Sequence, residues 1–222
     1  MHLKLINLSD PLILINVIFQ SIIALCGLAI LIAILINFLD DRKNKRQAKE
    51  NKHFVETESM FLFFLIFFLI ISFKIGVIEV FPRQLSWIIN LFLLLTIIFS
   101  TTINLLGRAN LGKNWANQIR IYQDQTLITT GVYSIVRHPL YASLIWIFFA
   151  LSLITENWLA FTINLLIFIP MMYWRAYHEE KLLKLRFSGY QNYQKQTAMF
   201  LIKPEKIIAY FKFLIKKLNG KA

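Results

Sequence analysis

The chain has 222 residues, of which 57% are hydrophobic and only 16% are charged. A soluble globular domain has about 45–50% apolar and about 25% charged residues, so this composition excludes a soluble enzyme, a secreted disulfide scaffold and a disordered tail. The net charge is +12. In a soluble protein, a net charge this positive would indicate a nucleic-acid partner. In a membrane protein, basic residues first indicate which side of the bilayer each loop occupies. With a single cysteine, Cys26, we expect no disulfide framework and no CxxC metal site within one chain. No metal and no nucleic-acid partner are expected.

Five apolar segments follow one another along the chain and predict an all-α integral membrane protein. Each has roughly the 20 residues that a helix needs to cross a bilayer. Lys74 and Glu79 fall inside the second segment, near the end marked by Pro82, where long side chains reach the interface; a polar pathway is the alternative. The predicted spans are residues 12–39, 59–81, 85–106, 139–155 and 158–174.

The basic residues are concentrated on one side of the predicted bilayer. Residues 40–58, residues 107–138 and the chain from Arg175 onward hold 21 of the 24 Lys and Arg residues. Because cytoplasmic loops are enriched in Lys and Arg, we expect the N-terminus outside and the C-terminus in the cytoplasm. Five spans agree with termini on opposite sides. The membrane is expected to be a bacterial inner membrane or the endoplasmic reticulum.

The C-terminal tail has a different pattern from the spans. Over residues 204–218 apolar side chains recur at helical spacing, with lysines between them. This pattern predicts a basic amphipathic helix. It is expected either on the anionic inner leaflet or against the cytoplasmic face of the protein itself.

Polar residues concentrate in two patches on the expected cytoplasmic side. The first patch covers residues 118–141 and the second covers residues 175–193, with the fourth and fifth spans between them. Only Glu156 and Asn157 separate those spans. The spans therefore predict a tight helical hairpin, which brings both patches to the same membrane surface.

Each patch alone has an ordinary interpretation. Arg137, His138 and Pro139 fit the basic flank, the cap and the first turn of a span. Tyrosines at this depth are commonly interfacial. Arg175 and Glu179 are four residues apart, as in a surface ion pair worth about 0.2–0.5 kcal/mol.

Together, the patches resemble the isoprenylcysteine carboxyl methyltransferase family, and phospholipid N-methyltransferases share part of the pattern. The first patch carries G-V-Y-x-x-x-R-H-P-x-Y from Gly131, and the second carries R-x-x-x-E-E-x-x-L from Arg175 and F-x-x-Y-x-x-Y from Phe187. The resemblance covers about residues 105–204. The chain departs from it at Ser143, where the family usually has glycine, at Gln125, where some relatives have histidine, and in the shortened Phe187-Ser188-Gly189-Tyr190.

The resemblance implies a membrane methyltransferase that uses S-adenosyl-L-methionine and acts on a lipid-tailed, isoprenylcysteine-like carboxylate. Its partners would be the lipid bilayer and that lipid-tailed methyl acceptor. Arg175 matches the residue that contacts the acceptor, and Glu180, at the second glutamate, is a further catalytic candidate. The implied cofactor-binding residues are Gln118, Gln125, Thr126, Leu127, Ile128, Tyr133, His138, Pro139, Leu140, Tyr141 and Glu179.

These residue types suit methyl transfer from a sulfonium, which mainly requires donor and acceptor to be held in line. Glu179 suits an ammonium group, while a neutral His138 and the tyrosines offer hydrogen bonds and ring faces. A carboxylate acceptor needs no base and fits the guanidinium of Arg175, which also suits a phosphate headgroup. An amine acceptor would need a base, for which Glu180 or His138 is available.

Three other functions remain open at this point. They are a phospholipid or other lipid N-methyltransferase, a sterol-type membrane reductase, which generally has more spans, and a non-catalytic membrane scaffold. The sequence divides into a three-span membrane region (residues 1–106), a catalytic methyltransferase region with the helical hairpin (residues 107–204) and an amphipathic basic tail (residues 205–222).

Overall fold

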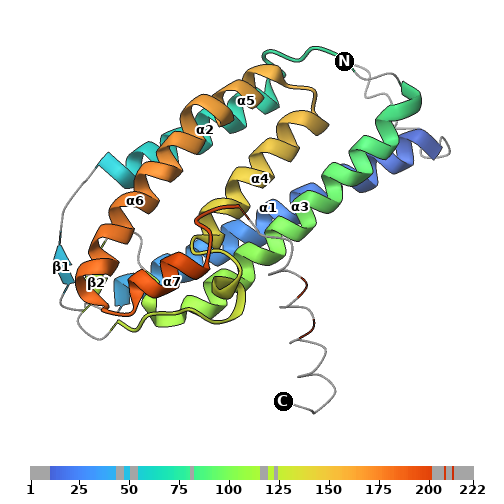
Figure 1. The fold of residues 1–222 in the computed structure, drawn as a ribbon. Helices are drawn as coiled ribbons and strands as arrows, with labels where there is room; N and C mark the ends of the chain where they lie inside the picture. The colour runs from blue at the N-terminus through green and yellow to red at the C-terminus, as the bar shows by residue number, and fades with distance from the viewer. Residues whose placement is uncertain are drawn as a thin grey trace.

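The computed structural model describes residues 11–43, 48–50, 55–80, 83–115, 120–122, 125–201, 208 and 212. Long helices dominate these residues and run in roughly the same direction, with α1 and α3 side by side and α4 between α3 and the helices α5 and α6 (Figure 1). The main helices are α1 (Pro11–Lys43), α2 (Val55–Ser72), α3 (Arg83–Leu111), α4 (Pro139–Ile154), α5 (Trp158–Ile163) and α6 (Ile169–Arg186). The short elements are β1 (Ala48–Glu50), β2 (Arg120–Tyr122), α7 (Tyr190–Gln196), the 3₁₀ turns η1 (Gly112–Asn114) and η2 (Gly131–Ser134), and the π-helical turn η3 (Asn164–Phe168).

Every predicted apolar segment contains a helix, and three helices are long and apolar enough to cross a membrane. These are Ile13–Asn37, Trp87–Leu111 and the continuous helix Trp158–Arg186. The other two apolar helices, Ser59–Ser72 and Pro139–Ile154, are shorter. The structure therefore fits a helical membrane protein. Length supports a crossing for three of the five predicted spans.

The second predicted span is too long, because α2 ends at Ser72 and not near residue 81. Lys74 and Gly76 both have positive φ, at 55° and 82°, so the chain turns out of the helix. A side chain at Gly76 would collide with Leu159 of α5, which shows how closely this turn lies against the hairpin. Lys74 and Glu79 are exposed and lie beyond the helix.

The fifth predicted span ends too early, because the helix continues from Trp158 through η3 and α6 to Arg186. The π-helical turn comes just before Pro170, whose ring removes a backbone donor and crowds the preceding turn of an α-helix. The continuation carries Arg175, Glu179 and Glu180 on the same helix as the apolar residues. The second polar patch is therefore a direct extension of the hairpin.

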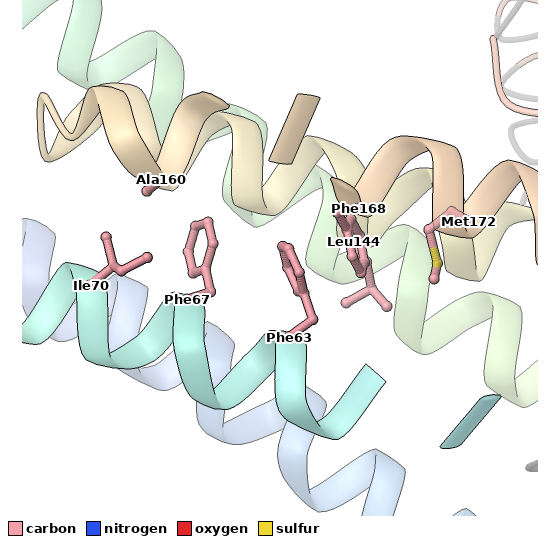
Figure 2. Close-up of a cluster of buried hydrophobic side chains, with 7 residues drawn as sticks. All are labelled: Phe63, Phe67, Ile70, Leu144, Ala160, Phe168 and Met172. Carbon is pink, nitrogen blue, oxygen red and sulfur yellow. The ribbon is translucent and has the colours of Figure 1, made fainter. Parts of the chain in front are cut away.

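An aromatic core joins α2 to the hairpin (Figure 2). Phe63 stacks on Phe168 with ring centroids 4.5 Å apart, and Phe67 lies 4.6 Å from Phe148. Figure 2 shows the α2 side chains facing those of the other helices across a shared interior. Large aromatic side chains bury much apolar area and favour such offset or edge contacts, so this cluster fixes α2 against α4 and α6. Its buried members are Phe63, Phe67, Ile70, Leu144, Ala160, Phe168 and Met172.

The hairpin turn is tight, as the sequence predicts. α4 ends at Ile154 and α5 begins at Trp158, with Glu156 at a positive φ of 48°. Asn157 caps α5 by accepting a hydrogen bond from the amide of Ala160 at 2.9 Å. Its side-chain amide also donates to the carbonyl of Ile70, which ties the hairpin to the end of α2.

The described residues are almost entirely helical, as predicted, and another expectation lies outside them. The exception is β1 and β2, which pair antiparallel over three residues each. A pair this short adds few backbone hydrogen bonds and leaves no sequence pattern of its own. Of the predicted amphipathic tail, only Ile208 and Lys212 are described, and both are exposed.

Candidate active site

Residues after α7 hold in place the segment that leads from the first polar patch into α4. The backbone amides of Arg137 and His138 donate to the carbonyls of Ala198 and Met199 at 2.9 and 3.2 Å. His138 occupies the N-cap position of α4, but its side chain does not cap the helix. The imidazole is therefore free to point toward the second patch, contrary to the simple capping interpretation.

Glu180 lies at the centre of a buried polar network and is only 2% exposed. Its Oε1 accepts from Nε of Arg137 at 2.8 Å and lies 3.2 Å from Nε2 of His138, while its Oε2 accepts from Gln194 at 2.7 Å. Arg137 donates further to the carbonyls of Gln194 and Thr197. A buried carboxylate with this many donors is fully satisfied, so Glu180 joins α4, α6 and α7.

Glu179 is placed quite differently from its neighbour, with 39% of its side chain exposed. Its Oε2 accepts a hydrogen bond from the hydroxyl of Tyr141 at 3.1 Å and lies 3.5 Å from Nδ1 of His138. Consecutive residues on a helix point about 100° apart, so one glutamate faces the interior and the other faces the open site. Glu179 is thus oriented by protein groups while retaining a face for a ligand.

His138 lies between these two carboxylates. Its Nε2 lies 3.2 Å from Oε1 of Glu180, and its Nδ1 lies 3.5 Å from Oε2 of Glu179. Burial lowers the pKa of His138, but the hydrogen bonds and charges of Glu179 and Glu180 outweigh it and raise the pKa above its ordinary 6.5. The two carboxylates therefore favour the imidazolium form over the neutral form expected from the sequence.

A pocket opens beside this network, at the end of the hairpin where both polar patches meet. Arg175 is 5% exposed, and its guanidinium carbon lies 5.9 Å from the ring centroid of Tyr141. Three arginines and a carboxylate therefore line one pocket that also has tyrosine rings. Of the sequence-predicted site residues, the pocket is lined by Gln125, Tyr133, His138, Leu140, Tyr141, Arg175 and Glu179.

Other predicted site residues are not brought to the pocket. Glu180 is buried in the network behind it, and Pro139 is buried at the start of α4. The backbone amide of Thr126 donates to Asn114 at 3.1 Å, which anchors the loop that carries Gln125. Gln118 lies outside the described residues. The pocket lining does not include Thr126, Leu127, Ile128, Pro139 or Glu180.

The structure adds pocket residues that the sequence interpretation missed. Arg108 was counted only among the basic residues of its side, and Arg137 was a basic flank and a motif position without an assigned role, yet both are buried and line the pocket. Asn114 and Trp115 come from the segment after α3, to which the sequence interpretation assigned no site residue. The signal for Arg108 was its place four residues after Asn104, since both polar residues fall on one face of an apolar helix. The added polar or aromatic lining residues are Arg108, Asn114, Trp115 and Arg137.

Two further hydrogen bonds show what Ser143 and Tyr193 do in the structure. Ser143, which stands where the family usually has glycine, accepts a hydrogen bond from Asn104 of α3 at 2.8 Å. Tyr193 of the second patch donates to the carbonyl of Tyr133 in η2 at 2.6 Å. The serine thus adds a polar link between α3 and α4. The tyrosine fixes a residue of the pocket wall from the far patch.

Fold and site together define a helical membrane protein with a polar pocket at one end of a helical hairpin. The model of the isoprenylcysteine carboxyl methyltransferase (ICMT) family matches residues 92–185. The resemblance drawn from the paired motifs is therefore confirmed over this segment, which extends from α3 to the end of α6. A search of curated proteins found no match. This segment, with its apolar helices, is therefore similar to a family of membrane methyltransferases.

Proposed function

We propose that the protein is an integral-membrane, S-adenosylmethionine-dependent methyltransferase that methylates a carboxylate on a lipid-tailed, isoprenylcysteine-like acceptor. The observation that carries the proposal is the convergence of Glu179, Arg175 and Tyr141 on one pocket from two patches of the chain. A partly exposed carboxylate and a buried arginine offer separate positions for a cationic donor and an anionic acceptor.

The donor set of the pocket fits the cofactor. When bound, S-adenosylmethionine supplies a methyl group already activated by its sulfonium. Glu179 keeps a face open beside its bonds to Tyr141 and His138, which suits the ammonium of the amino-acid end. The rings of Tyr133 and Tyr141 supply electron-rich faces, which favour cations. We propose Gln118, Gln125, Thr126, Leu127 and Ile128 as the surrounding segment that encloses the cofactor.

Arg175 is proposed to orient the acceptor. Its planar guanidinium fits a carboxylate through two parallel hydrogen bonds, and the ring of Tyr141 lies against it. A carboxylate is a nucleophile at neutral pH, so the protein needs only to hold it in line with the methyl group. His138, favoured as a cation between two carboxylates, is a poor general base, which supports a carboxylate over an amine acceptor.

The apolar wall of the pocket supports a lipid-tailed acceptor. Met60 of α2, Leu140 and Leu144 of α4 line one part of it, so the membrane helices contribute directly to the site. An acceptor with an apolar tail would place that tail along these side chains and its carboxylate at Arg175. The cofactor, which is water-soluble, would enter from the aqueous side.

Glu180 is proposed to be a positioning residue that acts through His138 and Arg137. It bonds to both and does not line the pocket. Its position is suited to fixing the imidazole, which in turn orients Glu179. A direct contact with substrate would require Glu180 to leave three donors behind.

The activity is tested with the purified full chain, methyl-labelled cofactor, a total lipid extract and synthetic prenylcysteine analogues. We expect label in a base-labile ester. Label only in a base-stable headgroup would contradict the carboxylate acceptor and favour a lipid N-methyltransferase. Binding of NADPH without binding of S-adenosylmethionine would favour a reductase. Absence of both binding and label would favour a non-catalytic scaffold.

We further propose that the pocket faces the cytoplasm, because the basic residues concentrate on its side of the chain. The test uses single cysteines in a Cys26→Ser background, placed at Ser188 or at Glu79, which are both exposed. A membrane-impermeant thiol reagent on intact cells is expected to label Glu79→Cys and not Ser188→Cys. The reverse pattern would overturn the orientation.

A further inference from the structure

Arg108 lies near the end of α3 and lines the pocket, although it is only 8% exposed. The apolar character of α3 makes a buried arginine costly unless its charge is compensated. Its position is separate from that of Arg175, which comes from α6 and lies against Tyr141. Besides Arg175, Arg137 and His138, the pocket therefore contains an arginine from α3 that the proposed function does not use.

The side chain of Arg108 is oriented by a chain of polar contacts. Its Nε donates to Oδ1 of Asn104 at 2.9 Å, and the amide of Asn104 donates to Ser143 at 2.8 Å. Its guanidinium carbon lies 5.7 Å from the ring centroid of Trp115. Asn104 is fully buried, so this arrangement is fixed from within the helix bundle. One edge of the guanidinium is used for positioning.

The other edge of the Arg108 guanidinium, at Nη1, is not used for this positioning. Within the described part of the chain, the buried Nη1 of Arg108 has no hydrogen-bond partner. A buried guanidinium N–H without an acceptor carries a desolvation cost, and a bound oxyanion would remove that cost. Carboxylates and phosphates match the planar guanidinium best. The chemistry of Arg108 therefore indicates an anionic oxygen group inside the pocket.

The groups that share the pocket with Arg108 indicate which anion this is. Glu179 and Tyr133 line the same pocket, and 39% of the Glu179 side chain is exposed. The pKa of the Tyr133 hydroxyl agrees with this arrangement, because burial and the negative charge of Glu179 raise it while the positive charge of Arg108 opposes the rise. A carboxylate and a guanidinium in one pocket complement a zwitterionic amino-acid group, whose ammonium and carboxylate are attached to the same carbon.

We propose that Arg108 binds the α-carboxylate at the amino-acid end of S-adenosylmethionine while Glu179 binds the adjacent ammonium. This inference rests on the proposed function. It leaves Arg175 for the anionic group of the acceptor, so the two arginines hold different ligands. Arg108 is then a cofactor-binding residue supplied by the third long helix, outside the motifs of both patches.

The first test needs no variant. Affinities of the full wild-type chain are measured by titration calorimetry for S-adenosylmethionine and for its decarboxylated analogue, which keeps the ammonium and the sulfonium. We expect wild type to bind the analogue about 10- to 100-fold more weakly, as for loss of one charge-assisted hydrogen-bonded pair. Equal affinities would overturn the role of the carboxylate.

The second test compares Arg108→Gln with Arg186→Gln, which changes an exposed arginine at the end of α6. Arg108→Gln is expected to lower affinity for S-adenosylmethionine by about 10- to 100-fold and affinity for the analogue by less than about 3-fold. Arg186→Gln is expected to leave both unchanged. Asn104→Ala, which removes the positioning bond and keeps the charge, should give a smaller loss with the same selectivity.

Each other outcome has a definite meaning. Equal losses for both ligands in Arg108→Gln would overturn the proposal in favour of a structural role. Unchanged cofactor affinity with a raised KM for the acceptor would overturn it in favour of an acceptor-binding role. Failure of wild type to bind S-adenosylmethionine at all would reject the proposed function itself. A wild type that binds both ligands equally rejects this inference alone.

Discussion

Nε of Arg137 donates to Oε1 of Glu180 across 2.8 Å, and both side chains are buried. The pair joins the arginine of the first-patch motif, two residues before α4, to the second glutamate of the α6 motif, and the two are 43 positions apart in the chain. It holds the two polar patches in contact. Its neighbour Glu179 is thereby placed with its carboxylate at the pocket.

Removing one partner of this pair should be strongly destabilising. Glu180→Ala leaves the Arg137 guanidinium buried without its carboxylate, and breaking a buried ion pair in this way costs about 3–5 kcal/mol. We expect a clear fall in the thermal midpoint of the detergent-solubilised protein. Lys184→Ala, at an exposed position on the same helix, is the matched control and should leave the midpoint unchanged. An unchanged midpoint for Glu180→Ala would contradict the structural role of the network.

The charge of His138 predicts how stability depends on pH. Its folded-state pKa is raised above the ordinary 6.5, because the two carboxylates outweigh burial. Its contribution to stability is therefore fully present below 6.5 and is lost as the pH rises through the raised folded-state pKa. The thermal midpoint of wild type should fall over that window relative to His138→Gln. A parallel dependence in both proteins would show that another group is responsible.

Two substitutions on one face of α6 should separate binding from turnover. Glu179→Ala is expected to weaken binding of S-adenosylmethionine by about 10-fold or more, because it removes a charge-assisted hydrogen bond. Arg175→Ala is expected to keep cofactor affinity and to lower kcat/KM for the acceptor. Calorimetry and initial rates check the two effects separately. If both variants bind and turn over as wild type does, the site assignment is wrong.

Asn157 offers a test of the hairpin that leaves the pocket untouched. Asn157→Ala removes the N-cap bond to Ala160 and the bond to the carbonyl of Ile70. Loss of such a cap costs about 0.5–2 kcal/mol, so the thermal midpoint should fall modestly. Cofactor affinity should stay unchanged, since the turn is at the opposite end of α4 from His138. A large loss of affinity would show that the hairpin turn and the pocket are coupled.

Apolar composition predicted the helices well, because a long run of apolar residues has few stable alternatives to a helix in a bilayer. The ends of the predicted helices were less accurate than their positions. α2 ends at Ser72 because Gly76 turns against Leu159, a residue of α5. The helix that contains α5 and α6 continues to Arg186, and hydropathy missed this continuation because it counts Arg175 and Glu180, which are buried, as solvent-facing residues.

The sequence by itself determined the helical membrane character, the hairpin and the resemblance to the family, because composition, spacing and motifs are properties of neighbouring residues. Only the tertiary structure separated Glu179, which faces the pocket, from Glu180, which is buried. Only the tertiary structure also raised the pKa of His138, by placing it between two carboxylates, and brought Arg108 into the site. Burial and charge are set by residues far apart in the chain, so a motif cannot assign them.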